Sequence, residues 1–123
     1  MNKILLVDDD DEFRRMLRLT LVRLGYEVIE ARNGREALHL QRVAENEVMI
    51  TDLIMPDQEG LETIMAFRRE FPAVRIIAMS GGGRINATDF LNMAKLFGAS
   101  QTLTKPFSNP ELTMALEAVL VPN

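Results

Sequence analysis

Hydrophobic positions along the chain follow two alternating patterns. Short apolar runs are typical of strands buried on both faces of a sheet, and apolar residues three or four positions apart are typical of amphipathic helices. The predicted strands are Ile4–Val7, Tyr26–Glu30, Val48–Ile50, Val74–Met79 and Thr102–Thr104. The predicted helices extend over Phe13–Leu24, Asn33–Val43, Leu61–Phe67, Ile85–Phe97 and Ser108 or Asn109 to Leu120. Ser80 and the three glycines after it are expected to end the fourth strand.

The order of these elements predicts the fold class. Each strand is followed by a helix, which favours a parallel sheet covered by helices on both faces. Repeated five times, this unit gives a doubly wound α/β domain with a five-stranded sheet and five helices. The 123 residues suit one such domain, and 47% hydrophobic residues are enough for its core.

Composition excludes several kinds of site. The chain has no cysteine, which rules out disulfides, thiolate zinc sites and cysteine nucleophiles, and its single histidine, His39, cannot form a multi-histidine metal site. A net charge of -4 does not favour binding to the negatively charged phosphates of nucleic acid. No apolar run approaches the roughly 20 residues of a membrane helix, and Ile4–Val7 does not resemble a signal peptide. We therefore expect a cytoplasmic protein that contacts neither nucleic acid nor membrane directly.

Chemically active residues stand where the predicted strands end. Asp8–Asp11 follow the first strand, Asp52 follows the third, Ser80 the fourth and Lys105 the fifth. Ligands of open parallel sheets bind beyond the carboxyl ends of the strands. The sequence therefore predicts that acids, a hydroxyl and a lysine converge on one edge of the sheet.

This combination favours phosphoryl chemistry with a metal ion. Carboxylates that lie close together repel one another unless a cation compensates their charge. Oxygen ligands without histidine or cysteine indicate a hard cation such as Mg²⁺. A carboxylate can act as a nucleophile and form an acyl phosphate, while a lysine and a metal carry the charge of the phosphoryl oxygens. The hydroxyl of Ser80 could then hydrogen-bond a phosphoryl oxygen.

Five segments of the chain form a recognisable series: Ile4–Asp10, Ala31–Leu38, Thr51–Pro56 followed by Gly60, Ile76–Ser80 and Lys105–Phe107. In their order and spacing they resemble the response-regulator receiver family of two-component signalling. The resemblance covers essentially the whole chain, which is therefore expected to form a single receiver (phospho-acceptor) domain over residues 1–123. It implies the strand order 2-1-3-4-5 of the flavodoxin-like and CheY-like folds.

The resemblance also implies an acceptor and a metal site. By position, Asp52 resembles the residue that accepts the phosphoryl group. Asp8 and Asp9 resemble the pair that holds Mg²⁺, one of them directly and the other directly or through water. Asp52 and the backbone carbonyl of Ile54 would complete the protein ligands of the metal.

Two further residues and a set of partners follow from the same resemblance. Ser80 resembles the hydroxyl that turns toward the phosphoryl group, Lys105 the lysine that pairs with it, and the bond between Lys105 and Pro106 is expected to be cis. The phosphoryl donor would be a histidine kinase or histidine-phosphotransfer protein, which the first helix commonly helps to dock. The face of the fourth helix, fifth strand and fifth helix would control an output protein or domain, and the resemblance also allows a homodimer. Such a chain modifies itself without turning over a separate substrate, so we expect a switch and not an enzyme.

Two positions depart from the family pattern. Thr102 stands three residues before Lys105, where receivers often carry an aromatic ring that moves inward with the hydroxyl. The glycines Gly81–Gly83 follow Ser80, where a less flexible loop is common. We expect this glycine loop to be mobile without phosphate and to become ordered on phosphorylation.

Two other functions fit parts of the sequence. A metal-dependent phosphatase or phosphotransferase with an aspartyl nucleophile usually needs a second acid two residues later and a cap domain, but that position is Ile54 and the chain is short. A degenerate receiver that only binds a partner would lack acids or the lysine, and none is missing. A nucleotide cradle at Ser80–Gly83 is disfavoured, because the lysine and hydroxyl that end a P-loop are absent.

Several residues are expected to have only structural roles. Asp10 and Asp11 suit the first turn of a helix, where the dipole favours acids, and His39 suits an exposed or half-buried helix position. The eight methionines are interpreted as core filler. The arginines of the first helix are expected to form a solvated face or a partner contact: Arg14, Arg15, Arg18 and Arg23.

Overall fold

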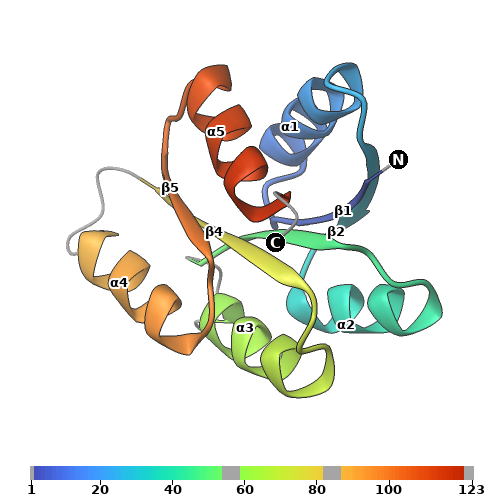
Figure 1. The fold of residues 1–123 in the computed structure, drawn as a ribbon, viewed down its shortest axis with the longest axis vertical. Helices are drawn as coiled ribbons and strands as arrows, with labels where there is room; N and C mark the ends of the chain where they lie inside the picture. The colour runs from blue at the N-terminus through green and yellow to red at the C-terminus, as the bar shows by residue number, and fades with distance from the viewer. Residues whose placement is uncertain (1, 54–58, 82–86, 121–123) are drawn as a thin grey trace.

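The computed structural model describes residues 2–53, 59–81 and 87–120 and confirms the doubly wound α/β architecture. A five-stranded parallel sheet has the order β2-β1-β3-β4-β5, as the resemblance implied (Figure 1). The strands are β1 (Lys3–Val7), β2 (Glu27–Ala31), β3 (Val48–Asp52), β4 (Arg75–Gly81) and β5 (Gln101–Lys105). The helices are α1 (Asp11–Arg23), α2 (Gly34–Val43), α3 (Glu59–Glu70), α4 (Ala87–Phe97) and α5 (Asn109–Leu120).

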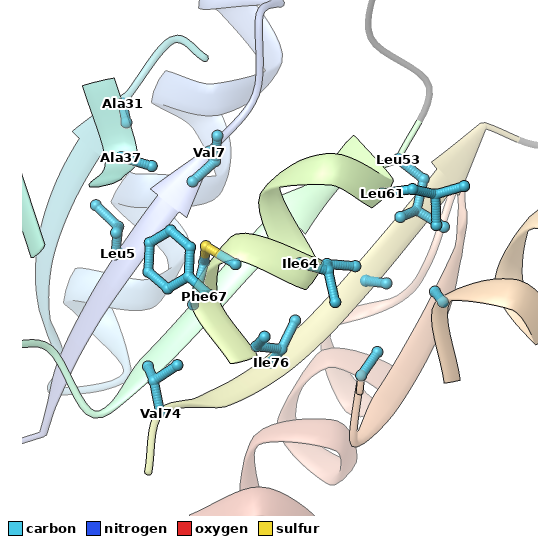
Figure 2. Packing of buried hydrophobic residues seen from close by; sticks show 14 residues of the cluster. Leu5, Val7, Ala31, Ala37, Leu53, Leu61, Ile64, Phe67, Val74 and Ile76 are labelled. Carbon is cyan, nitrogen blue, oxygen red and sulfur yellow. The ribbon is translucent and has the colours of Figure 1, made fainter. Parts of the chain in front are cut away.

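Helices cover both faces of the sheet. Helices α1 and α5 lie on one face, and α2, α3 and α4 lie on the other (Figure 1). Alternate residues of β1 supply the two cores, because side chains of a strand point to opposite faces: Leu5 belongs to one hydrophobic cluster and Leu6 to the other. The fully buried ring of Phe67 from α3 packs in the first cluster, near Leu5 and Ile76 (Figure 2). This two-sided burial explains the near-continuous apolar runs of the sequence.

The fourth strand is longer than its apolar run predicted. The expectation that Ser80 already ends the strand was wrong, because β4 continues through Ser80 and ends at Gly81, the first of the three glycines. Ser80 pairs with Thr104 and Gly81 pairs with Lys105 of β5. Backbone pairing with the neighbouring strand holds these residues in the sheet although their side chains are not apolar. Ser80 is therefore fixed by the sheet itself.

Capping groups define the starts of three helices. The side chains of Asp10 and Asn33 accept hydrogen bonds from the third residue after each, at 3.1 and 2.8 Å, and so cap α1 and α2. Ser108 caps α5 in a reciprocal arrangement with Glu111. The prediction of Asp10 as a helix-start residue is confirmed. Residues 85 and 86, which were expected to begin the fourth helix, lie outside the described residues.

Gly60 allows α3 to begin directly against the end of β3. A Cβ atom at this position would lie 2.5 Å from the carbonyl oxygen of Asp52 and 2.6 Å from the Cα of Leu53. Real Cβ atoms do not approach backbone atoms so closely, so only glycine fits without a shift of the chain. The first turn of α3 thereby packs against the carboxyl end of the strand that carries Asp52.

The interpretation of the methionines as core filler was only partly right. Met49 and Met79 are fully buried in the sheet. Four others are exposed: Met16, Met65, Met93 and Met114. His39 is exposed, within the range that was expected for it. Among the helices of the described residues, none has the length and apolar character needed to cross a membrane.

Candidate functional site

Three carboxylates meet at the carboxyl edge of the sheet. Asp8 directly follows β1, Asp9 is the next residue, and Asp52 is the last residue of β3. One carboxylate oxygen from each lies within 4.8 Å of the other two. Asp8 is fully buried and Asp52 is 6% exposed, whereas Asp9 is open to solvent. We call these three residues the acidic pocket.

Lys105 reaches the acidic pocket from the end of β5. Its Nζ lies 2.8 Å from Oδ2 of Asp8 and 3.7 Å from Oδ2 of Asp52. The same ammonium lies 4.1 Å from the centroid of the Phe13 ring, a cation–π contact. Lys105 thus brings one positive charge to a cluster of three acids, and the bond that follows it, to Pro106, is cis as the resemblance implied.

Asp8 is held at every polar group. Its backbone N–H donates to the carbonyl of Ala31 at 3.2 Å, and its own carbonyl accepts from the guanidinium of Arg14 at 2.7 Å. Oδ1 accepts from the N–H of Asp10 at 2.9 Å, and Oδ2 accepts from Lys105. The first acid of the pocket is therefore fixed in position by β2, by α1 and by β5.

Ser80 is buried beside the strand of Asp52 without a partner for its hydroxyl. In the register of β3 and β4, Asp52 lies opposite Met79, the residue before Ser80. Ser80 is fully buried, and within the described part of the chain its Oγ has no hydrogen-bond partner. A buried hydroxyl without a partner costs about 1–3 kcal/mol, which calls for an explanation. A hydrogen-bonding ligand at the carboxyl edge of the sheet would supply one.

Arg14 belongs to this site, and the expectation of a solvated face was wrong for it. The residue is only 5% exposed. Besides the carbonyl of Asp8, it donates to Oε1 of Glu30 and to Oδ1 of Asp11, each at 2.8 Å. Burial disfavours its charge, but hydrogen bonds from Arg14 to Asp11 and Glu30 outweigh this and raise the pKa of the guanidinium.

The sequence carried a signal for Arg14. The buried residues of α1 are Arg14, Leu17 and Leu21, which are spaced as one face of a helix. Arg15 and Arg23 are exposed as expected. The hydrogen bond from Arg14 lowers the pKa of Asp11, in keeping with a structural role for that acid.

Three predicted positions lie outside the described residues: Ile54, Gly82 and Gly83. The carbonyl of Ile54 was expected to bind the metal, and the two glycines belong to the loop that was expected to order on phosphorylation. Thr102 is half-buried in β5, opposite Ala78 of β4.

The fold and the edge of acids and lysine define the class of CheY-like α/β domains, and comparisons with known proteins give the family. A model of the response regulator receiver domain matches residues 4–117. The chain belongs to the receiver-domain family of two-component response regulators.

Relatives agree with this assignment. The transcriptional regulatory protein SrrA of Staphylococcus aureus is 31% identical over 119 residues, which cover 97% of this chain and 48% of SrrA. The chain therefore spans about half the length of the curated relatives that it matches. The chemotaxis protein CheY4 of Vibrio cholerae superposes with a TM-score of 0.86 at 34% identity, covering 98% of this chain and 99% of CheY4. TrrA of Thermotoga maritima, crystallised in complex with Mg²⁺-BeF, gives 0.84 at 28% identity, covering 98% of this chain and 100% of TrrA.

Proposed function

We propose that this chain is a Mg²⁺-dependent switch in which Asp52 accepts a phosphoryl group from a histidine kinase or a histidine-phosphotransfer protein. One observation carries the proposal: three carboxylates lie within 4.8 Å of one another, with the ammonium of Lys105 beside two of them. A carboxylate nucleophile, a hard-cation site and a lysine are the parts that phosphoryl transfer requires.

The residues of the acidic pocket fit Mg²⁺. They offer only oxygen donors, which Mg²⁺ prefers, and they concentrate negative charge that needs a cation. We assign the metal to Asp8, Asp9 and Asp52, with the backbone carbonyl of Ile54 as a further ligand. When bound, Mg²⁺ neutralises part of the charge on these carboxylates and on the phosphoryl oxygens. The similar receiver TrrA, crystallised with Mg²⁺-BeF, supports this assignment.

The transfer gives a separate role to each of three residues: Asp52, Lys105 and Ser80. A carboxylate oxygen of Asp52 forms a bond to phosphorus while the bond from phosphorus to the donor's histidine nitrogen breaks, and the electron pair leaves with that nitrogen. Lys105, already 3.7 Å from Asp52, donates a hydrogen bond to a phosphoryl oxygen. The buried hydroxyl of Ser80 turns to donate another, which supplies the partner that it lacks in the described structure.

The output of the switch is proposed to be the face of α4, β5 and α5. Exposed apolar side chains mark both helices of this face, with Leu96 84% exposed on α4 and Met114 70% exposed on α5. A partner protein, an output domain or a second copy of the chain could cover them. Because Thr102 replaces the usual aromatic residue, the movement of Ser80 would reach this face through β4 and β5 without a ring that changes its burial.

The chain is proposed to act as one receiver domain over residues 1–123, in the cytoplasm, without binding nucleic acid or membrane itself. It would catalyse its own phosphorylation and dephosphorylation and turn over no separate substrate. Exposed Arg15 and Arg23 of α1 are candidates for contact with the phosphoryl donor, because they lie on either side of the exposed apolar residues Met16 and Leu19 along this helix.

Intact-mass spectrometry tests the proposal. The chain is incubated with acetyl phosphate in Mg²⁺ or in EDTA, alongside Asp52→Asn. We expect one added phosphate in the wild type with Mg²⁺, and none in EDTA or in the variant. Wild-type protein that is folded and binds Mg²⁺ but gains no phosphate would instead be a receiver-shaped binding module.

A further inference from the structure

The guanidinium of Arg14 is a buried charge that the proposed transfer does not use. Its side chain is 7% exposed and it donates to three separate acceptors: the carbonyl of Asp8, Asp11 and Glu30. Burying a charge is costly unless hydrogen bonds compensate it. The two carboxylates supply that compensation, so the third bond, to an uncharged carbonyl beside the acidic pocket, calls for its own explanation.

The bond from Arg14 fixes the peptide that joins the first two acids of the pocket. Because the peptide unit is planar, the direction of the Asp8 carbonyl sets the direction in which the chain enters Asp9. Arg14 holds this carbonyl at 2.7 Å, while Ala31 of β2 accepts from the N–H of Asp8 at 3.2 Å. In the part of the chain that the structure describes, no hydrogen bond or ion pair holds the carboxylate of Asp9 itself. The direction of the Asp9 side chain therefore depends on the backbone conformation of this residue.

An arginine suits this position better than a lysine would. The planar guanidinium presents donors in several directions at once, so Arg14 can reach α1, β2 and the end of β1 together. Glu30 is itself steadied by Arg18, whose Nε lies 3.6 Å from its second oxygen. These three contacts connect α1 with β2 and with the residue that follows β1, Asp8.

We infer that Arg14 is a positioning residue of the acidic pocket: by holding the carbonyl of Asp8, it sets the direction of the Asp9 carboxylate and so the affinity of the pocket for Mg²⁺. The inference rests on the proposed function, because it concerns the same site. The acceptors of Arg14 among the described residues are the carbonyl of Asp8, Asp11 and Glu30. Its effect reaches the pocket through the main chain.

Two single variants separate positioning from simple stabilisation. Arg14→Met keeps an unbranched apolar stem but removes every hydrogen bond. Glu30→Gln weakens the ion pair with Arg14 but leaves the bond from Arg14 to the Asp8 carbonyl in place. Arg15→Met is the matched control, because Arg15 is the next residue of the same helix and is exposed.

The affinity for Mg²⁺ is measured by NMR titration of the amide signals of Asp9 and Asp10, at a temperature where denaturation curves show every variant to be folded. We expect Arg14→Met to bind Mg²⁺ about tenfold more weakly than wild type, since residues that orient metal ligands typically contribute 10–100-fold in affinity. Glu30→Gln loses stability but changes the affinity about twofold or less, and Arg15→Met changes neither.

Labelling by acetyl phosphate gives an independent readout. In Arg14→Met, the Mg²⁺ concentration that gives half of the maximal labelling rate should rise in step with the dissociation constant, while the rate at saturating Mg²⁺ stays near that of wild type. A purely structural role would lower stability and leave this concentration unchanged.

The outcomes distinguish the inference from the function on which it rests. If wild type fails to bind Mg²⁺, the proposed function fails. If wild type binds Mg²⁺ and is labelled, but Arg14→Met has the same affinity, the positioning role is overturned and the function stands. Should Arg14→Met not fold, Arg14→Lys decides: one ammonium cannot serve all three acceptors, so about threefold weaker binding supports the role. Unchanged binding by Arg14→Lys refutes it.

Discussion

At the scale of single residues, the site combines charged side chains that contact several neighbours with one buried hydroxyl, that of Ser80, which has no hydrogen-bond partner among the described residues. Asp8, Lys105 and Arg14 are each tied to several neighbours. Ser80 is as deeply buried as Asp8, yet no described residue accepts from or donates to its Oγ. We propose that this hydroxyl forms its hydrogen bond only with a phosphoryl oxygen. It therefore does not stabilise the unphosphorylated protein.

Replacing Ser80 by alanine should therefore leave the resting chain as stable as wild type or up to about 1 kcal/mol more stable, because an unsatisfied buried hydroxyl is removed. Thr51→Val is the control: Thr51 is equally buried, but its hydroxyl donates to the carbonyl of Asp52 at 3.2 Å, so its loss should cost about 1 kcal/mol. Urea denaturation measures both. Equal losses in the two variants would show that Ser80 is satisfied in the resting state.

The sequence correctly predicted the location of the site residues that stand at the ends of strands. Asp8, Asp52 and Lys105 were expected at one edge because parallel strands share their carboxyl ends, and the structure brings them together. Arg14 was missed because an arginine on a helix is solvated by default. Only its spacing with Leu17 and Leu21 indicated otherwise, and the acceptors that compensate its charge come from other elements.

At the scale of elements, the first turn of α3 packs closely against the end of β3. Gly60→Ala would place a Cβ atom 2.5 Å from the backbone of Asp52. We expect a loss of about 1–3 kcal/mol from the forced shift, together with slower labelling of Asp52. Gly81→Ala at the end of β4 is the control for stability, since nothing lies within 4 Å of an added Cβ there. Thermal or urea unfolding that shows the same small effect for both variants would contradict this picture.

A bidentate ion pair joins helices α2 and α3 and should make stability depend on pH. Arg42 lies 2.6 and 2.7 Å from the two carboxylate oxygens of Glu70, and its hydrogen bonds lower the pKa of that acid below the ordinary value of 4.5. A pKa that is lower in the folded state gives stability that is present above 4.5 and is lost as pH falls through the folded value.

The difference in unfolding free energy between wild type and Glu70→Gln should therefore be largest near neutral pH and shrink below pH 4.5. Because the pair is exposed, the difference is small and should weaken further in high salt. Denaturation curves at several pH values measure it, with Glu62→Gln on the same helix as the control. A difference that grows on acidification would reverse the sign that we expect.

Element boundaries were the part of the fold that sequence patterns predicted least well. The apolar run of β4 stops at Met79, but its strand continues to Gly81, because Thr104 and Lys105 of β5 pair with it. Backbone pairing with a segment that is distant in the sequence does not change the local pattern of apolar residues. Apolar periodicity reports burial, and backbone hydrogen bonds between strands extend beyond the buried residues.

At the scale of the whole molecule, the alternation of apolar runs and amphipathic stretches was enough to predict a parallel sheet with helices on both faces. The strand order came from the family resemblance, since several orders satisfy the same alternation. The surface was less well predicted: Met16, Met65, Met93 and Met114 are exposed although methionine usually fills cores. Local patterns do not show which apolar side chains a partner would cover.

The central claim is that Asp52, and no other acid of the pocket, accepts the phosphoryl group. Borohydride reduces the acyl phosphate of an aspartate to homoserine, so the acceptor can be identified by peptide sequencing after labelling with acetyl phosphate and Mg²⁺. We predict homoserine at position 52 alone, with Asp8 and Asp9 intact. Homoserine at Asp8 or Asp9 in place of Asp52 would contradict the assignment of roles within the acidic pocket, and no homoserine in labelled protein would contradict an acyl phosphate altogether.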